Sequence, residues 1–465
     1  MKDMISNLPD SILHYILSLL PTKDAIQTSI LAKRWKYLWT GLSVFDFRKY
    51  LSITFINQRQ KSVDCVFDQV DRLIYHSNYV RRLSVMIDPV WAMVPGFSID
   101  ADKVNSLIST AMKHNIEELK LFLPVRPPFN LSNCFSASKS LNKLVLHLGC
   151  VLDVSRGIHF PSLKTLKLSF VTFANEKSAQ QLFSGCPVLQ KLSLCNCSWD
   201  NIEQINIKFP TLKTLTISGA CSSRGHLLNS TVTIDVANLL YFSYKSHVTI
   251  ELVFVNLDSI VDAHIDVPAP SESLIKLLSG LGNIKSLRLS NDMVECFSYD
   301  FHLLPMFNNL THLNVDLGNF MFTEEAIMDI LQKTPKLEVL NIPMGFYPDI
   351  CLDGEDWILN SVPSCFKNSL KLFSISNFDG GEAEIQLLKF LLENATVLSE
   401  IRIFCSKILS ADLKKQAEIS NQLQPVGLGS CVIKLYQESA MEKIVGDKQI
   451  TYTEKYLLLA GLQDY

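Results

Sequence analysis

One short phrase occurs at four places between residues 141 and 217. It reads LNKLVL at 141–146, LKTLKL at 163–168, LQKLSL at 189–194 and LKTLTI at 212–217. Each copy has an apolar residue, two variable residues, and then two apolar residues that flank a further variable residue. The central leucines, which are 22, 26 and 23 residues apart, are Leu144, Leu166, Leu192 and Leu215. A leucine-rich chain produces such a phrase by chance, but not at so constant a spacing, so the sequence predicts a repeat architecture.

The same phrase extends beyond this stretch in both directions. It precedes it as IEELKL at 116–121 and follows it as IKSLRL at 284–289, LTHLNV at 310–315 and LEVLNI at 337–342. The copies fit leucine-rich repeats, whose units are about 20–29 residues long. Between Phe242 and Leu287 the phrase blurs, and residues 257–260 are a candidate for one divergent unit. The number of repeats between residues 230 and 285 stays open.

The phrase implies a particular packing of side chains. Its apolar-x-apolar part belongs to a short strand in which alternate residues point inward. Parallel stacking of such strands buries the leucines in one continuous core and builds a curved solenoid. The predicted fold class is therefore α/β, with parallel strands on the concave face. Residues 183–187 and 331–335, each ending in Pro, are the predicted return segments.

Length and composition narrow the class of protein. The chain has 465 residues, more than the roughly 250–300 that one core accommodates. Its 43 Lys and Arg and 46 Asp and Glu give a formal charge of −3, which argues against nucleic acid or an anionic membrane as the main partner. We find no apolar run of about 18 residues and no secretory signal. The twelve cysteines are therefore expected to be reduced and buried, in the nucleus and/or the cytoplasm.

The first forty residues predict three short helices. Leu8-Pro9-Asp10 favours a helix start, Pro21 ends that helix, and Thr22 is a good N-cap for the next. The apolar positions of these helices are Ile12, Leu13, Ile16, Leu17, Leu19, Leu20, Ala25, Ile26, Ile30, Leu31, Trp35, Leu38 and Trp39. So small a unit cannot bury this much apolar surface by itself. The helices either dock on the rest of the chain or present a face to a partner, and periodicity leaves both alternatives open.

The run LPDSILHYILSLLPTKDAIQTSILAKRWKYLW at 8–39 resembles an F-box without a gap. The resemblance includes the Leu-Pro start, the turn at 20–23 and the closing Lys33-Arg34-Trp35 with Leu38-Trp39. F-boxes bind Skp-type adaptors of Skp–cullin–F-box (SCF) ubiquitin ligases. The residues that the resemblance assigns to forming or supporting the adaptor-facing surface are Leu8, Pro9, Ile16, Leu19, Leu20, Leu31, Trp35 and Leu38.

The C-terminal third resembles the FBD region of plant F-box/leucine-rich-repeat proteins. The resemblance rests on Trp357, residues 362–365, 378–380, 391–395 and 429–433. The predicted domains are an F-box at 1–48, a leucine-rich-repeat solenoid at 49–345, an FBD region that continues the repeats at 346–436, and a C-terminal extension at 437–465.

Signatures of catalysis are missing from the sequence. The phosphate-binding G-x-x-x-x-G-K-[ST], the zinc-protease H-E-x-x-H and the serine-hydrolase G-x-S-x-G do not occur. Cys195 and Cys197 form a C-x-C pair, but no second pair lies at zinc spacing. We expect no metal and no cofactor.

The resemblance implies a non-catalytic substrate-recognition subunit of an SCF ligase, with the Skp adaptor, through it cullin, and an unknown protein substrate as partners. Substrate would bind variable residues of the concave strands, each of which is also compatible with an ordinary solvated strand position. The candidates are Lys120, Lys143, Lys167, Lys191, Arg288, His312, Asn314 and Asp316.

Two competing hypotheses belong to other classes. A repeat-protein scaffold that recruits no ligase would use its first helices as an N-terminal cap, which predicts that the first repeats bury those helices fully. An enzyme with a divergent site would need a deep pocket with a convergent nucleophile or base, and the sequence points to none.

Overall fold

The computed structural model divides the chain into two compact units, unit 1 at Met1–Val236 and unit 2 at Ala237–Tyr465. The residues that the structure describes are 5–51, 59–77, 79–87, 99–123, 138–154, 158–200, 202–219, 227–246, 249–267, 272–294, 304–316, 324–343, 362–423 and 431–437. Trp357 of the FBD resemblance and the predicted C-terminal extension after Gln437 lie outside them.

Unit 1 begins with the predicted helical region. Its elements are α1 at Asp10–Ser18, α2 at Thr22–Gln27, and two 3-10 segments, η1 at Thr28–Ile30 and η2 at Lys33–Gly41. The third predicted helix is thus 3-10 in form. The prediction of Thr22 as an N-cap is wrong, because Pro21 holds that position and the Thr22 hydroxyl accepts the backbone N–H of Asp46 at 2.7 Å. This bond ties α2 to the first strand.

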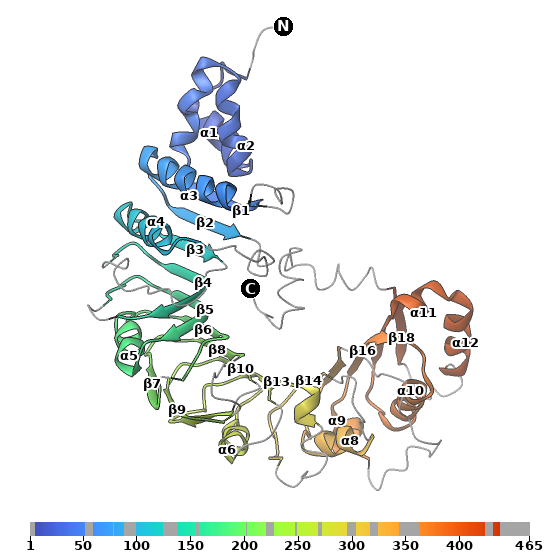
Figure 1. Ribbon diagram of the computed structural model, residues 1–465. Helices are drawn as coiled ribbons and strands as arrows, with labels where there is room; N and C mark the ends of the chain where they lie inside the picture. The colour runs from blue at the N-terminus through green and yellow to red at the C-terminus, as the bar shows by residue number, and fades with distance from the viewer. Residues whose placement is uncertain are drawn as a thin grey trace. The chain divides into compact units, whose positions relative to one another are not determined.

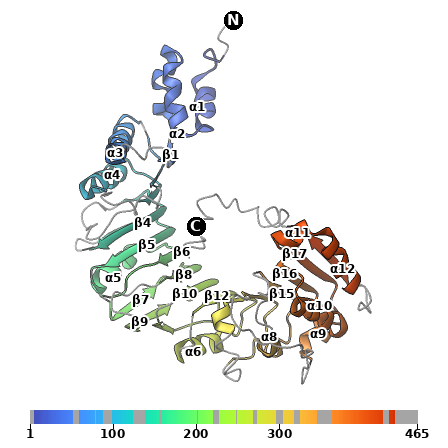
Figure 2. The same ribbon diagram turned by 45° about the vertical axis from the view of Figure 1, so that its right-hand side comes forward.

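The rest of unit 1 is a parallel sheet with helices on one side. Its strands, in spatial order, are β1 at Val44–Leu51, β2 at Arg82–Ile87, β3 at Glu118–Phe122, β4 at Lys143–Leu152, β5 at Thr165–Phe173, β6 at Lys191–Cys195 and β8 at Thr214–Ser218. The helices are α3 at Arg59–His76, α4 at Ala101–Lys113 and α5 at Glu176–Ser184, on the same side of the strands (Figure 1 and Figure 2). A separate pair joins β7 at Gln204–Lys208 to β9 at Leu227–Asp235. We call the side of each sheet that faces away from the helices its strand face.

Unit 2 continues the pattern. Its parallel strands, in spatial order, are β10 at Tyr241–Lys245, β12 at Asp262–Asp266, β13 at Ser286–Leu289, β14 at His312–Val315, β15 at Val339–Ile342, β16 at Leu372–Phe378, β17 at Glu400–Cys405 and β18 at Val432–Tyr436. Its other elements are β11 at Thr249–Phe254, α6 at Glu272–Gly280, α8 at Glu324–Gln332, α9 at Ser364–Asn368, α10 at Glu382–Asn394, α11 at Lys407–Ala411 and α12 at Leu413–Leu423.

The central leucine of each phrase forms the core of unit 1. In the strand register Leu119 pairs with Leu144, and the row continues through Leu166, Leu192 and Leu215. All five side chains are buried, because strand alternation turns them toward the helices. The predicted α/β repeat fold with parallel strands is confirmed.

Several strands carry the phrase with residues other than leucine, which the leucine pattern did not predict. In β1 and β10 aromatic side chains fill the leucine positions, with Phe45 and Phe242 fully buried. Between Phe242 and Leu287, the predicted divergent unit at 257–260 is not the strand. The strand is β12, a few residues later, and its buried residues are Ala263 and Ile265. The core accepts Ala or Phe in place of Leu when neighbouring side chains compensate for the change in volume. Alternation of apolar residues therefore indicates a repeat strand more reliably than the presence of leucine.

A buried carboxyl group organises the start of α10. One oxygen of Glu384, Oε2, accepts the backbone N–H groups of Gly381 at 3.0 Å and Asp379 at 3.1 Å, as in a capping box. The other oxygen, Oε1, is buried without a hydrogen-bond partner in the described part of the chain. Burial raises the pKa of Glu384 to about 7, although the backbone donors oppose this rise.

Truncation of one core leucine should destabilise unit 1 markedly. For Leu166→Ala we expect the free energy of unfolding to fall by about 2–5 kcal/mol, because the buried side chain leaves a cavity. Urea denaturation followed by circular dichroism measures it. The control is Thr165→Ala on the strand face of the same strand, expected to change stability by less than about 0.5 kcal/mol. Equal effects would contradict the assigned faces.

Stability should depend on pH through Glu384. Its folded pKa of about 7 exceeds the ordinary value of 4.5, so the folded state holds a proton that the unfolded chain releases. Stability is then greatest below pH 4.5 and falls as pH rises to about 7, by on the order of 3 kcal/mol. Urea midpoints measured from pH 5 to 8 should show this slope in the wild type and a smaller one in Glu384→Gln. Identical slopes would contradict the assignment.

Candidate protein-interaction surfaces

Several large apolar side chains of the helical region at 5–41 are exposed to solvent. Leu19 is 68% exposed and Leu31 is 67% exposed, although both are leucines in or beside short helices. Other large apolar residues exposed in the same region are Ile5, Ile12, Tyr15, Leu20, Ile30 and Tyr37. We call Ile12, Tyr15, Leu19, Leu20, Ile30 and Leu31 the apolar patch. Single exposed apolar residues are ordinary on protein surfaces, whereas such a group on forty residues is typical of a protein-binding site.

A second set of apolar residues in the same helices forms their core. Leu13, Leu17, Ala25, Trp35 and Leu38 are buried. The wide stripe that the sequence showed on α1 is thus divided between two faces, one packed against η2 and one exposed. The division explains why three short elements hold so many apolar residues.

Arg34 fixes the segment that precedes α1. Its guanidinium donates to the backbone carbonyls of Ser6 and Leu8, the latter at 2.7 Å, and forms an ion pair with Asp10 at 2.7 Å. The Trp35 indole N–H donates to the Ser6 hydroxyl at 2.8 Å. These bonds hold the Leu-Pro start against η2.

The predicted adaptor-facing residues separate into three groups. Leu19, Leu20, Leu31 and Pro9 are exposed, and Leu8 and Ile16 are half-buried. Trp35 and Leu38 lie in the core, so they support the surface instead of forming it. The prediction omitted Ile12, Tyr15 and Ile30, which are exposed; periodicity cannot tell which of two apolar faces remains uncovered.

The strand face of unit 1 carries four of the predicted substrate-binding residues, namely Lys120, Lys143, Lys167 and Lys191. The carboxylate of Glu118 lies at one end of this group, 2.9 Å from Arg82 and 3.7 Å from Lys120. Burial opposes the ionisation of Glu118, but the hydrogen bond and charge of Arg82, with Lys120 and Lys143, outweigh it and lower its pKa. Glu118 therefore stays ionised at neutral pH.

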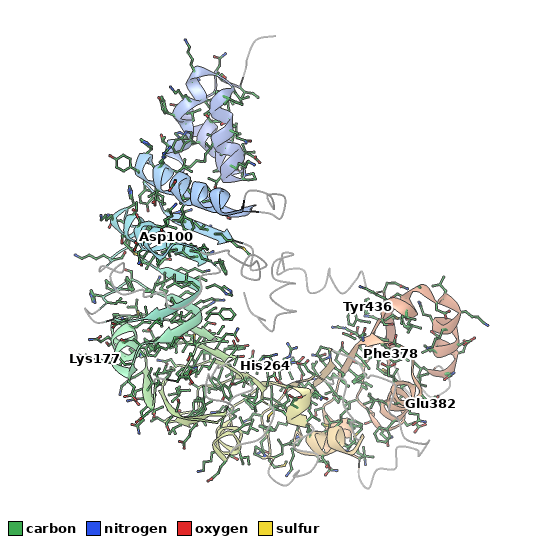
Figure 3. The ribbon with its side chains drawn as sticks, in the orientation of Figure 1. Asp100, Lys177, His264, Phe378, Glu382 and Tyr436 are labelled. Carbon is green, nitrogen blue, oxygen red and sulfur yellow. The ribbon has the colours of Figure 1, made fainter. Side chains whose placement is uncertain are left out.

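The strand face of unit 2 holds the other four predicted residues. Arg288 forms a bidentate ion pair with Asp316, at 2.8 and 3.1 Å, and Asn341 donates to Asn314 at 3.0 Å. His312 lies at the strand start, 2.9 Å from the Thr311 hydroxyl. Figure 3 shows His264 on this side of the sheet and Glu382, on α10, on the other. Arg288, Asn314 and Asp316 are thus adjacent, across two strands.

Charge pairing on unit 2 extends beyond these residues. Lys245 lies 2.8 Å from Asp266, and Glu400 contacts Arg402 at 3.0 Å and Lys434 at 2.9 Å. Hydrogen bonds from Arg402 and Lys434 lower the pKa of Glu400 to about 2. Lys245, Arg402 and Lys434 therefore each form an ion pair within unit 2.

Within the described ranges, no group of His, Cys, Asp and Glu could hold a metal ion. In the same residues, no helix is long and apolar enough to cross a membrane. The thiols of the predicted C-x-C pair are buried, and Cys197 donates to the Leu168 carbonyl at 3.6 Å.

Comparison with known proteins agrees with this arrangement. The sequence model of the F-box domain matches residues 5–47, and a model described as At1g61320/AtMIF1, LRR domain, matches residues 75–424. The F-box/LRR-repeat protein At3g59210 of Arabidopsis thaliana is 30% identical over 459 residues, which cover 91% of this chain and 92% of the relative. The chain belongs to the F-box/leucine-rich-repeat family.

Other members of the F-box/leucine-rich-repeat family from Arabidopsis thaliana match as well. The F-box/LRR-repeat protein At4g14103 is 31% identical over 360 residues, 73% of this chain and 91% of the relative. The putative F-box/FBD/LRR-repeat protein At3g59240 is 26% identical over 472 residues, 94% of this chain and 90% of the relative. The F-box and repeats are confirmed, and the FBD-like motifs have a counterpart in a relative's name.

Residues of the apolar patch should contribute little to folding. We expect Leu19→Ser/Leu31→Ser to unfold within about 2 °C of the wild type, because both side chains already contact water. Leu17→Ser, on the buried face of α1, should lower the unfolding temperature of unit 1 by about 5–10 °C. Differential scanning calorimetry measures both. A large loss in the double variant would show that the patch is buried in solution.

Proposed function

We propose that this F-box/leucine-rich-repeat protein is the substrate-recognition subunit of an SCF ubiquitin ligase. The apolar patch is the main support for the proposal. It would bind a Skp-type adaptor, while the strand faces of the repeats would bind a protein substrate for ubiquitination. The F-box match at 5–47 supports the same adaptor class, since adaptor binding is the usual function of this domain.

The exposure of the patch favours this function over the non-ligase scaffold. A scaffold that used α1, α2 and η1 only as a cap would cover their apolar side chains with the first repeat. The described contacts of this region with the repeats run mainly through α2 and β1, including the bond from Asp46 to Thr22. Leu19, Ile30 and Leu31 lie outside that contact, and their exposure costs free energy that a bound partner would recover.

The contribution of this chain to ubiquitin transfer would be proximity. The F-box fixes one end of the chain to the ligase, and the repeats hold a substrate near the conjugating enzyme. Such placement turns a bimolecular encounter into a local one and requires no catalytic residue in this chain. We propose the nucleus or the cytoplasm as its compartment, where such ligases act.

A direct binding measurement tests the adaptor role. We expect the full chain to bind a purified Skp-type adaptor, and Leu19→Ser/Leu31→Ser to weaken this binding about 100-fold or more, because each leucine loses about 1.5–3 kcal/mol of apolar burial. Isothermal titration calorimetry or a quantitative pull-down gives the affinities.

The matched control is Ile408→Ser/Leu413→Ser. These side chains of unit 2 are 78% and 73% exposed, so the control removes similar exposed apolar groups from another surface. Unchanged adaptor affinity in the control supports a specific site. Failure of the folded wild type to bind the adaptor, or equal losses in both variants, would overturn the proposed function.

A further inference from the structure

A small cavity lies where the helical region at 5–41 meets the first strand and helix of the sheet in unit 1. Its lining side chains come from α2, η2, β1 and α3, and its volume is about 300 Å³. This volume is at the lower end of the range of small-molecule sites, about 300–1,000 Å³. Figure 1 and Figure 2 show α2 close to β1 and α3. The walls of the cavity therefore come from both regions.

The apolar part of the lining is aromatic and aliphatic. Phe47 of β1 is only 4% exposed, because strand alternation turns it toward the helices. Trp39 of η2, Ile26 of α2 and Leu73 of α3 are half-buried and line the same cavity. Half-buried aromatic and aliphatic side chains around a small cavity leave apolar surface that a ligand can cover.

The charged part of the lining is cationic. Arg72 and His76 are one turn apart on α3, so their side chains lie on the same side of that helix, and Lys23 adds a cation from α2. Within the described residues Arg72 forms no ion pair, and the carboxylate one turn before it, Asp68, lies 3.5 Å from Lys103. Lys23 also interacts within the protein, so Arg72 is the principal cation of the cavity.

We propose that this cavity binds a small amphipathic anion, namely an organic monocarboxylate with an aromatic or aliphatic body. The described lining contains no Asp or Glu, so a carboxylate there would meet no like charge from the lining. The ligand carboxylate would pair with the Arg72 guanidinium, which offers two parallel N–H donors. Its apolar body would contact Trp39 and Phe47. One ligand would thus contact the helical region and the start of the repeats at the same time.

The cavity is separate from the surface proposed for the adaptor. None of the residues of the apolar patch lines it. The inference therefore does not rest on the proposed function, and adaptor binding can be measured separately.

Three probes test the ligand class on the full chain. They are naphthalene-2-carboxylate, its neutral analogue naphthalene-2-carboxamide, and acetate, which keeps the charge but lacks the apolar body. Isothermal titration calorimetry should show binding of naphthalene-2-carboxylate, binding of the carboxamide that is weaker by about fivefold or more, and no binding of acetate. Naphthalene-2-carboxylate should also slow hydrogen exchange of backbone amides in α2 and α3 and leave α10 of unit 2 unchanged.

Single variants locate the site. Arg72→Gln should weaken binding of naphthalene-2-carboxylate about 5- to 10-fold and leave the carboxamide within about twofold, since only the acid pairs with the guanidinium. The control Lys177→Gln makes the same change in net charge on α5, where Figure 3 labels this residue, and should leave both affinities within about twofold.

A third variant fills the cavity. Gln27 is an exposed lining residue at the end of α2, so Gln27→Trp adds a large ring at the cavity wall without removing a core side chain. It should weaken binding of both naphthalene probes by about fivefold or more, because the ring occupies space that their apolar body needs. Circular dichroism verifies that each variant is folded.

Four outcomes would overturn the inference. They are no binding of naphthalene-2-carboxylate, equal affinity for the acid and the carboxamide, equal losses in Arg72→Gln and Lys177→Gln, and loss of probe binding in Leu19→Ser/Leu31→Ser. The last result would place the probe on the apolar patch instead of in the cavity.

Discussion

The burial of one leucine line by stacking is the constraint on which the rest of each unit depends. A single repeat exposes its apolar face, because a strand of five residues and one short helix cannot cover it. Parallel stacking places Leu119, Leu144, Leu166, Leu192 and Leu215 against one another and removes all of them from water. Strand alternation then assigns every second side chain to the opposite face. That face takes no part in the core, so its residues can vary without loss of the fold.

The F-box region follows a different rule. Its small core uses one apolar face of α1 and leaves a second face uncovered, as Leu17 and Leu19 illustrate: two residues apart on or beside one helix, one fully buried and the other 68% exposed. Arg34 holds the Leu-Pro start in place by bonding backbone carbonyls, so the exposed residues are presented on a fixed support. Both faces are apolar for different reasons. One packs in the core of this region, and the exposed one is the surface that we propose for the adaptor.

Ion pairs occur on the strand faces of both units. Register decides which charges meet, because side chains on neighbouring strands interact when they lie directly opposite or diagonally, two residues apart. In unit 2 Asp266 lies opposite Lys245, and Asp316 and Glu400 lie diagonally from Arg288 and Lys434. In unit 1 Lys143 aligns with Glu118, whose carboxylate also lies 3.7 Å from Lys120. On both strand faces, register therefore decides which cations lie near a carboxylate.

The repeat fold follows from sequence alone. The interval between phrases and the alternation of apolar residues within them can be read along the chain without knowledge of tertiary contacts. The F-box is recognisable for the same reason, as an ordered pattern over Leu8 to Trp39. Where aromatic residues or Ala replace leucine, as at Phe242 and Ala263, the pattern weakened although the packing did not. Tertiary structure decided which apolar residues face outward, which cations lie near a carboxylate, and that Glu384 is buried. Each of these depends on contacts between residues distant in sequence, and such contacts are set by register and by the packing of neighbouring elements, which no local pattern contains.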